Sequence, residues 1–153
     1  MRFVSIVLLA LLALSSCHLF HKSIPDQWEE SELRIINQKV LFEGVVFALE
    51  KEGFRVGTGA NPGDGTIESA WRVSASPFKG KGYRERAILT FGPGHEKGTS
   101  IVRLRIHRET NESIRPLLEG SAKWERDEDQ PAIAKRILQY VHSYVDPADK
   151  AGQ

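Results

Sequence analysis

Cysteine and net charge are what this chain of 153 residues lacks most. A single cysteine excludes an internal disulfide and a cysteine-based zinc cluster. Lys and Arg total 21 against 20 Asp and Glu, so the formal net charge is +1. Arg2 lies in an apolar leader, and without it the balance is 20 (21 − 1) against 20. Such a balance gives no reason to expect a nucleic-acid partner.

Metal-binding and catalytic motifs are also missing. The five histidines are scattered without an H-x-x-x-H pair, so no metal or cofactor is expected: they are His18, His21, His95, His107 and His142. There is no nucleophile elbow and no paired-acid motif, and the glycine-rich stretch 57–65 lacks the Lys-Ser/Thr of a phosphate loop. We predict that the chain is not an enzyme, although residues distant in sequence can still converge in space.

The longest apolar run lies at the start of the chain. Residues 3–14 are apolar apart from one serine and follow Arg2, which is typical of a secretory signal; a spanning helix needs about 20 apolar residues. The run ends in "LSSC", residues 14–17, which resembles a bacterial lipobox. The resemblance implies cleavage between Ser16 and Cys17, and acyl chains on Cys17 that anchor the chain in a membrane. The alternative is ordinary secretion, which leaves Cys17 as an exposed free thiol.

The position after Cys17 is occupied by His18 and not by aspartate. By resemblance to lipoprotein sorting signals in two-membrane bacteria, this favours the periplasmic face of the outer membrane. The chain is then predicted to divide into four parts: a signal peptide at 1–16, a lipidated tether at 17–25, one domain at 26–146 and a flexible tail at 147–153.

Two amphipathic helices are predicted in the domain. Residues 37–52 place their apolar positions on one stripe, and Gly53 suits the left-handed position after a helix end. Residues 131–145 show a second stripe and begin with a proline, which the first helical turn accepts. Residues 26–36 resemble a helix start capped by Asp26, either as an earlier turn of the first helix or as a separate piece.

Three segments between the helices alternate with the period of strands, namely 67–73, 83–91 and 102–107, and a short strand at 54–58 is expected before them. The predicted fold class is α+β: an antiparallel sheet of about four strands, with an N-terminal and a C-terminal helix packed on one face. We note that this order of elements contains no internal repeat.

The strand and helix patterns also predict where the three tryptophans lie in the domain. Trp71 and Trp124 are expected in the core or at its edge, because large aromatic side chains usually pack there. Trp28 lies near the tether, and two interpretations stay open for it. It either packs on the end of the sheet or touches a membrane or a partner.

Alternation places a row of basic side chains on the polar face of the sheet: Arg72, Arg84, Arg86, Arg103, Arg105 and His107. Only Glu68 offers obvious compensation there. Arginines in such a row can bind phosphates or carboxylates bidentately, as found on lipid headgroups, glycan acids or an acidic partner. The alternative is a solvated face on which arginine stems cover the sheet.

Residues 38–145 resemble the small domain of BamC-type (NlpB-like) envelope lipoproteins. The resemblance rests on "VVFALEKEGFRV", "GTIESAWR", the basic strand "YRERAIL" and a late tryptophan before an acidic helix start. It implies a sheet with helices on one side and an accessory, non-catalytic role in outer-membrane protein assembly. Unlike that family, this chain has one such domain and no long unstructured segment before it.

Together these patterns predict a lipid-anchored, non-enzymatic protein-interaction or accessory assembly module of a bacterial envelope. Its expected partners are a membrane, through the N-terminal lipid, and another envelope protein. The alternative function is a binding module for anionic envelope lipid or glycan, acting through the basic sheet face.

Overall fold

The computed structural model describes residues 23–34, 37–57, 60, 62–75, 81–113 and 122–145. The leader, the lipobox with Ser16 and Cys17, most of the tether and the tail lie outside these residues, so the predictions made for them stay predictions. Among the helices of the described ranges, none is long and apolar enough to cross a membrane.

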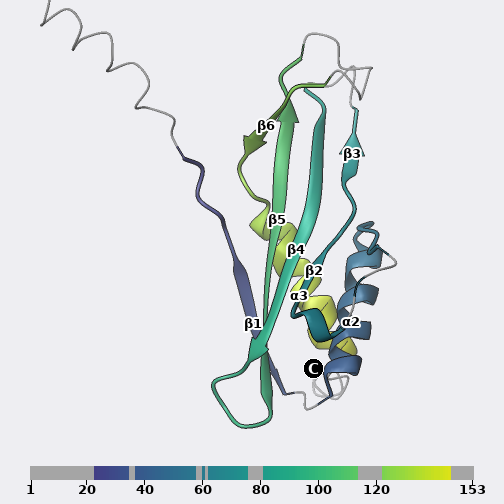
Figure 1. Cartoon of the computed structure of the whole chain (residues 1–153), viewed down its shortest axis with the longest axis vertical. Coiled ribbons are helices and arrows are strands. Elements are labelled where there is room, and N and C mark those ends of the chain that lie inside the picture. Colours follow the sequence, from purple (N-terminus) through teal and green to yellow (C-terminus); the bar gives the residue numbers. More distant parts are fainter. Residues whose placement is uncertain are drawn as a thin grey trace, which may run out of the picture.

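Six antiparallel strands form one sheet: β1 (Glu29–Arg34), β2 (Thr66–Glu68), β3 (Arg72–Ser74), β4 (Tyr83–Pro93), β5 (Thr99–Asn111) and β6 (Trp124–Asp127). The long hairpin of β4 and β5 forms its centre (Figure 1). β1 and β6 pair with successive parts of β5, while β2 and β3 pair with successive parts of β4. The α+β class and the antiparallel sheet are confirmed. The sheet has six strands and not four, but it is four rows wide because the short strands share rows.

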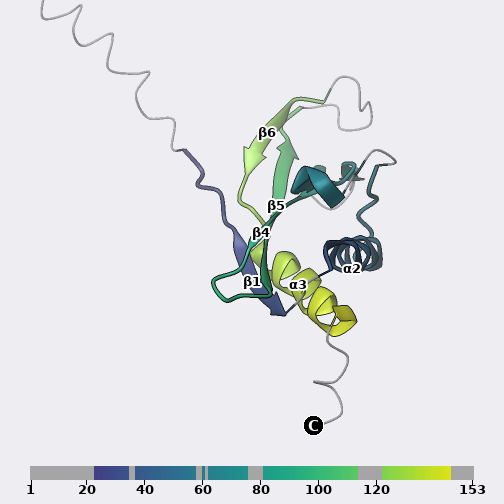
Figure 2. The ribbon, with the colours of Figure 1, turned by 60° about the horizontal axis from the view of Figure 1, so that its bottom comes forward.

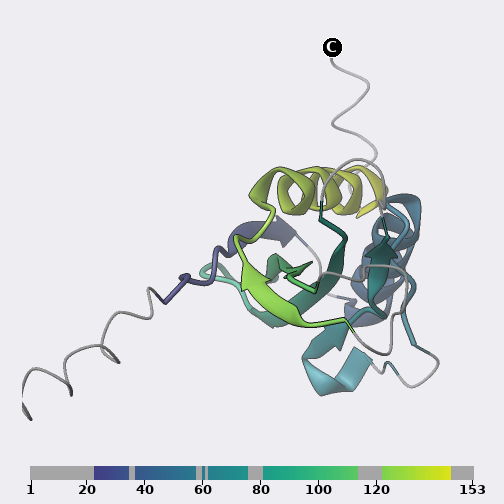
Figure 3. The ribbon, with the colours of Figure 1, turned by 90° about the horizontal axis from the view of Figure 1, so that it is seen from above.

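Two helices, α2 (Gln38–Lys51) and α3 (Pro131–Val145), lie on the same side of the sheet and pack against each other (Figures 2 and 3). The Asn37 side chain caps α2 by accepting a hydrogen bond from the Lys39 amide at 3.0 Å. At the other end Gly53 has a φ of 80°. The amides of Gly53 and Phe54 donate to the carbonyls of residues 50 and 49, each at 2.9 Å. This Schellman closure and both helices are confirmed as predicted.

The core lies between the sheet and the two helices. Its buried apolar residues are Leu33, Leu41, Val45, Ala48, Leu49, Phe54, Ile67, Ala87, Leu89, Val102, Leu104, Ile106, Ala134, Ile137, Leu138 and Val141. Tyr144, predicted on the apolar stripe of α3, is instead 43% exposed. It packs its ring against Phe47 of α2, with centroids 5.4 Å apart, at the surface of the helix pair.

In the described part of the predicted helix start, residues 26–34, no helix begins. From Glu29 to Arg34 the chain is extended and pairs with β5, with Glu29 opposite Leu104 and Arg34 opposite Thr99. Asp26 forms an ion pair with Arg105 and caps nothing. The hydrogen-bonded ladder to β5 and burial of one leucine in the core override the local helical preference.

The tip of the β4–β5 hairpin is held by one carboxylate of β1. Glu32 accepts hydrogen bonds from the Thr99 hydroxyl, from the backbone amide of His95 at 2.8 Å and from its ring at 3.0 Å. Hydrogen bonds from Thr99 and then His95 lower the pKa of Glu32 to about 2. Gly94 leaves the room for this clamp, because a Cβ there would lie 1.9 Å from the hydroxyl oxygen of Thr99 and 2.6 Å from the Glu32 carboxylate.

The prediction of one continuous strand at 67–73 fails in its second half. Ile67 is opposite Leu89, whereas Arg72 is opposite Glu85. The chain therefore advances five residues from β2 to β3 while β4 opposite advances only four. The extra residue between β2 and β3 is a bulge, and a one-residue offset turns every later side chain to the other face of the sheet. Ile67 is in the core as predicted, but the side chains of β3 are inverted.

Candidate functional site

The sheet face turned away from the helices gathers all three tryptophans of the chain with five arginines. We call it the Trp–Arg face, and it consists of Trp28, Trp71, Arg84, Arg86, Arg103, Arg105, His107, Trp124 and Arg126. The alternation of β4 and β5 places four of their five arginines and the histidine there, as predicted. The residue that alternation missed is Arg126, which the short strand β6 supplies opposite Glu109.

Arg72 is the one predicted basic residue that lies on the opposite face. Its guanidinium reaches the Glu85 carboxylate at 2.6 Å and lies 4.2 Å from the ring centroid of Phe54. It also donates to the backbone carbonyl of Glu52 at the end of α2. The bulge before β3 is the cause, because it inverts the side chains of the strand.

The same bulge moves Trp71 out of the core and onto the Trp–Arg face. The guanidinium carbon of Arg84 lies 4.3 Å from the Trp71 ring centroid and 4.8 Å from that of Trp124, so the arginine contacts both rings. Arg86 lies 4.8 Å from Trp71, and the His107 ring lies 5.5 Å from it. Both tryptophans are half-buried on the open face of the sheet, whereas the sequence predicted them in the core or at its edge. Each such cation–π contact contributes about 0.5–2 kcal/mol.

Trp28 lies farther along the same face. Its ring centroid is 5.2 Å from the guanidinium carbon of Arg105 and 5.6 Å from that of Arg103. The segment before β1 is held there by the Gln27 amide, which donates to buried Asp129 at 2.9 Å. The Trp28 ring therefore packs on the open face of the sheet and not on its end, and contact with a membrane or a partner stays a prediction.

Each arginine of the Trp–Arg face has a carboxylate partner, so Glu68 is not the only compensating charge. The nitrogen–oxygen pairs are Arg84–Glu109 at 2.6 Å, Arg86–Glu68 at 2.7 Å, Arg103–Glu30 at 3.3 Å, Arg126–Asp129 at 2.7 Å, and Arg105–Asp26 in direct contact. Five positive charges therefore meet five negative charges. Sequence alternation missed most of these partners, because Glu30 lies on β1, Asp26 precedes β1 and Asp129 follows β6.

Glu109 lies at the part of this face that holds Trp71 and Trp124, where it pairs with Arg84. Burial alone would raise the pKa of its carboxyl, but hydrogen bonds from His107 and Arg84 outweigh burial and hold the pKa below its ordinary value. The His107 ring nitrogen Nε2 is 3.1 Å from Glu109. These contacts fix the Arg84 guanidinium between two indole rings, so the surface is largely pre-organised.

The chemistry of this face is recognition by stacking and hydrogen bonding. In the described part of the chain, no three side chains of His, Cys, Asp or Glu are grouped closely enough to hold a metal ion. The exposed groups are indole edges, guanidinium groups and carboxylates, which offer apolar contact with donors and acceptors close by.

Comparisons with known proteins assign no family to the chain. No protein-family model matches the chain, and no curated protein matches it. Among solved structures it is similar to a TBP-like protein from Parabacteroides distasonis ATCC 8503, with 12% sequence identity over 84% of this chain and 92% of that chain. The TM-score is 0.37, which marks a likeness too distant to bear on function.

Proposed function

We propose that this chain is a lipid-anchored, non-enzymatic module of a bacterial cell envelope that binds another envelope protein through its Trp–Arg face. The observation that carries the proposal is the gathering of all three tryptophans, each in contact with arginine, on the sheet face that the helices leave open. Tryptophan and arginine are the residue types most enriched at the energetic centres of protein interfaces.

The charge pattern supports a protein partner over a free anion. Every arginine of the face already shares its charge with a carboxylate, as between Arg86 and Glu68 at 2.7 Å. A phosphate or an acidic glycan would have to displace these carboxylates, whereas a folded partner can pair with both signs of charge. The anionic-ligand alternative from the sequence therefore has less support than the protein-binding function.

The location rests on the sequence. The apolar leader and "LSSC" support cleavage before Cys17 and lipidation of its thiol. His18 supports the outer membrane, and the resemblance to BamC-type lipoproteins supports an accessory role in assembly there. Ten residues, 18–27, separate Cys17 from Trp28. A lipid on Cys17 would therefore hold the Trp28 end of the face within about 40 Å of the membrane, even with the chain fully extended.

Site-specific photo-cross-linking in cells tests the binding surface. Val73 and Phe47 are both exposed apolar residues, at 41% and 47%, but Val73 lies on the Trp–Arg face and Phe47 on α2. We expect a photoreactive phenylalanine at position 73 to give one discrete protein adduct, and the same residue at position 47 to give none. The Arg86→Glu variant should weaken the adduct at position 73, because it places a second negative charge beside that of Glu68.

Two results would count against this surface. Equal adducts from positions 73 and 47 would mean that the Trp–Arg face is not the docking site. Absence of an adduct, together with salt-sensitive binding to anionic vesicles that the Arg84→Glu/Arg103→Glu variant loses, would favour the anionic-ligand function.

The anchor is tested separately with Cys17→Ser. We expect the wild-type chain to sediment with membranes and its intact mass to show a cut before Cys17 with added acyl chains. The variant should lose both properties. If it still sediments and loses its leader at the same position, the lipoprotein interpretation is wrong.

A further inference from the structure

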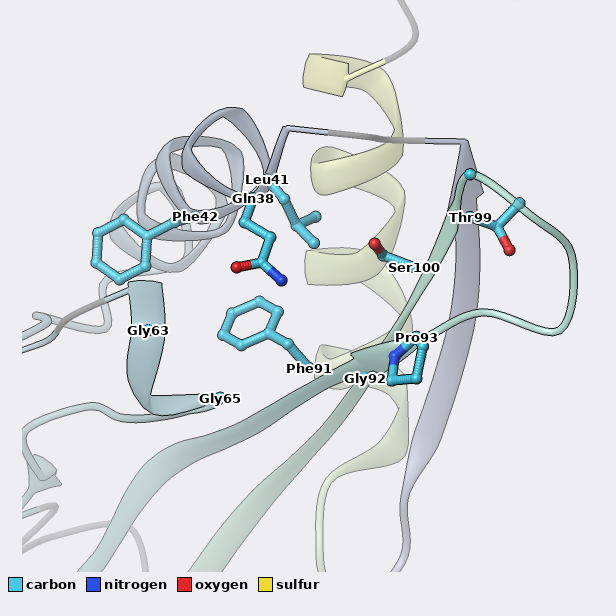
Figure 4. A pocket seen from close by; sticks show the side chains of 11 residues that line it. Gln38, Leu41, Phe42, Gly63, Gly65, Phe91, Gly92, Pro93, Thr99 and Ser100 are labelled. Carbon is cyan, nitrogen blue, oxygen red and sulfur yellow. The ribbon is translucent and has the colours of Figure 1, made fainter.

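A cavity of about 400 Å³ opens at the hairpin end of the molecule, on the helix side of the sheet (Figure 4). Three separate segments form its walls: the first turn of α2, the short 3-10 turn η2 (Pro62–Asp64) with the residue after it, and the end of the β4–β5 hairpin next to its turn. Its volume lies within the range of small-molecule sites, which is roughly 300–1,000 Å³.

Apolar side chains and glycines dominate the walls of this cavity. Leu41 is buried in the core beneath it, and the rings of Phe42 and Phe91 lie on two sides of it (Figure 4). Four lining residues are glycines, which leave the space open because no side chain fills it: Gly63, Gly65, Gly92 and Gly98.

Charge is absent from the described lining, in a chain of which 27% is charged. An ion that enters an uncharged, partly apolar cavity loses hydration without gaining a partner, and this disfavours charged ligands strongly. A neutral apolar group instead gains roughly 25 cal/mol for each Å² removed from water. The lining therefore selects for uncharged ligands.

One polar side chain projects into the mouth of the cavity. The Gln38 amide lies beside the ring of Phe91 (Figure 4) and makes no hydrogen bond to another described side chain. An amide offers two donors and one acceptor, so it can bind a carbonyl or hydroxyl group of a ligand whose apolar part lies against the rings. By contrast, the Thr99 hydroxyl at the rim already donates to Glu32.

We propose that this cavity binds an uncharged, mainly apolar small molecule that carries one hydroxyl or carbonyl group, with Phe42 and Phe91 enclosing its apolar part and Gln38 binding its polar group. The site is independent of the Trp–Arg face, since the two lie on opposite sides of the sheet. Loss of either function leaves the other unchanged.

Photolabelling of the full chain with two matched probes tests the proposal. One probe is a trifluoromethyl-diazirinyl benzyl alcohol, which is neutral, and the other is the corresponding benzoic acid, which is anionic and of similar size. We expect saturable labelling by the alcohol on peptides that contain residues 38–42 and 91–100. We expect the benzoate to label these peptides at least about tenfold less. Its carboxylate would lose hydration on entering the uncharged cavity, which weakens its binding.

Filling variants locate the site. Ser100 lies across the cavity from Phe42 (Figure 4), so Ser100→Leu should occupy the space and reduce labelling by about fivefold or more, while the matched control Ser143→Leu on α3 should not. Phe42→Trp fills the same space from the other wall and serves if Ser100→Leu does not fold. Gln38→Ala should weaken the alcohol probe with no loss of stability, because Gln38 is exposed at the start of α2.

Three outcomes would overturn the proposal. These are equal labelling by the two probes, labelling without saturation, and labelling that persists in a folded filling variant. Mapping of the saturable label to α3 instead of the cavity walls would have the same consequence.

Discussion

Replacement of Arg72 by methionine tests both the bulge and the charge network beneath it. Glu85 is buried on the helix side of the sheet, with its side chain only 3% exposed. The Arg72 guanidinium is 2.6 Å from its carboxylate, and Arg108 lies farther off at 3.6 Å. Methionine keeps most of the contact with Phe54 but leaves the carboxylate with the more distant arginine alone.

The expected loss of stability follows from burial. Removal of one partner from a buried ion pair costs about 3–5 kcal/mol. Arg72 is itself 34% exposed and Arg108 remains, so the lower end of this range applies, about 3 kcal/mol. For a domain of this size such a loss lowers Tm by roughly 10 °C. The matched control is Arg86→Met, whose partner Glu68 is 51% exposed, and it should cost only about 0–1 kcal/mol.

Urea denaturation of a double-mutant cycle provides the measurement. Arg72→Met, Glu85→Gln and the double variant should show a coupling energy of at least about 1.5 kcal/mol, because the two side chains are in direct contact. A coupling below about 0.5 kcal/mol would refute the reasoning. It would mean that Arg72 lies on the outer face, as simple alternation along residues 67–73 predicts, and that β3 is not inverted.

Three further predictions concern turns and the hairpin clamp. Gly94→Ala should lose about 1–3 kcal/mol in urea denaturation, whereas Gly92→Ala, whose added Cβ would meet nothing within 4 Å, should lose far less. The hydrogen bond that the His95 ring donates to the Glu32 carboxylate raises the pKa of His95. The stability contributed by His95 protonation is therefore fully present below pH 6.5 and is lost as pH rises through the raised pKa. An NMR titration should show that Glu32→Gln returns the His95 pKa toward 6.5, and no change would contradict the clamp. Gly53→Ala should cost about 1 kcal/mol in Tm-derived stability because φ is 80°, and a neutral effect would argue against the Schellman closure.

Much of the fold could be predicted from the sequence where one periodicity runs without interruption. The apolar stripe and the terminal glycine identify α2, and strict alternation in β4 and β5 places Arg84 and Arg105 on the open face. In contrast, the strand β1 carries three glutamates in six residues and becomes a strand only through pairing with β5. Tertiary contacts of this kind leave no local signal.

The candidate site could be predicted only in part, for two physical reasons. A bulge of one residue before β3 exchanges the faces of Trp71 and Arg72, and the side-chain pattern itself does not mark it. The carboxylates that neutralise the face, such as Glu30 and Asp129, come from elements far away in sequence. The sequence therefore indicates the arginines and one partner, Glu68, but neither the other carboxylates nor the tryptophans beside the arginines.

The long-range pairing of β1 also has a consequence for the order of folding. Its partners on β5 are 65 (99 − 34) to 75 (104 − 29) residues away in sequence, whereas β4 and β5 pair across a tight hairpin. Closing the longer loop costs more chain entropy, so the hairpin can form early and β1 is expected to join the sheet last. During synthesis β1 leaves the ribosome before β5, so it has no pairing partner until β5 has been made. Until β1 joins the sheet, the backbone groups along the edge of β5 are unpaired and can pair with other chains.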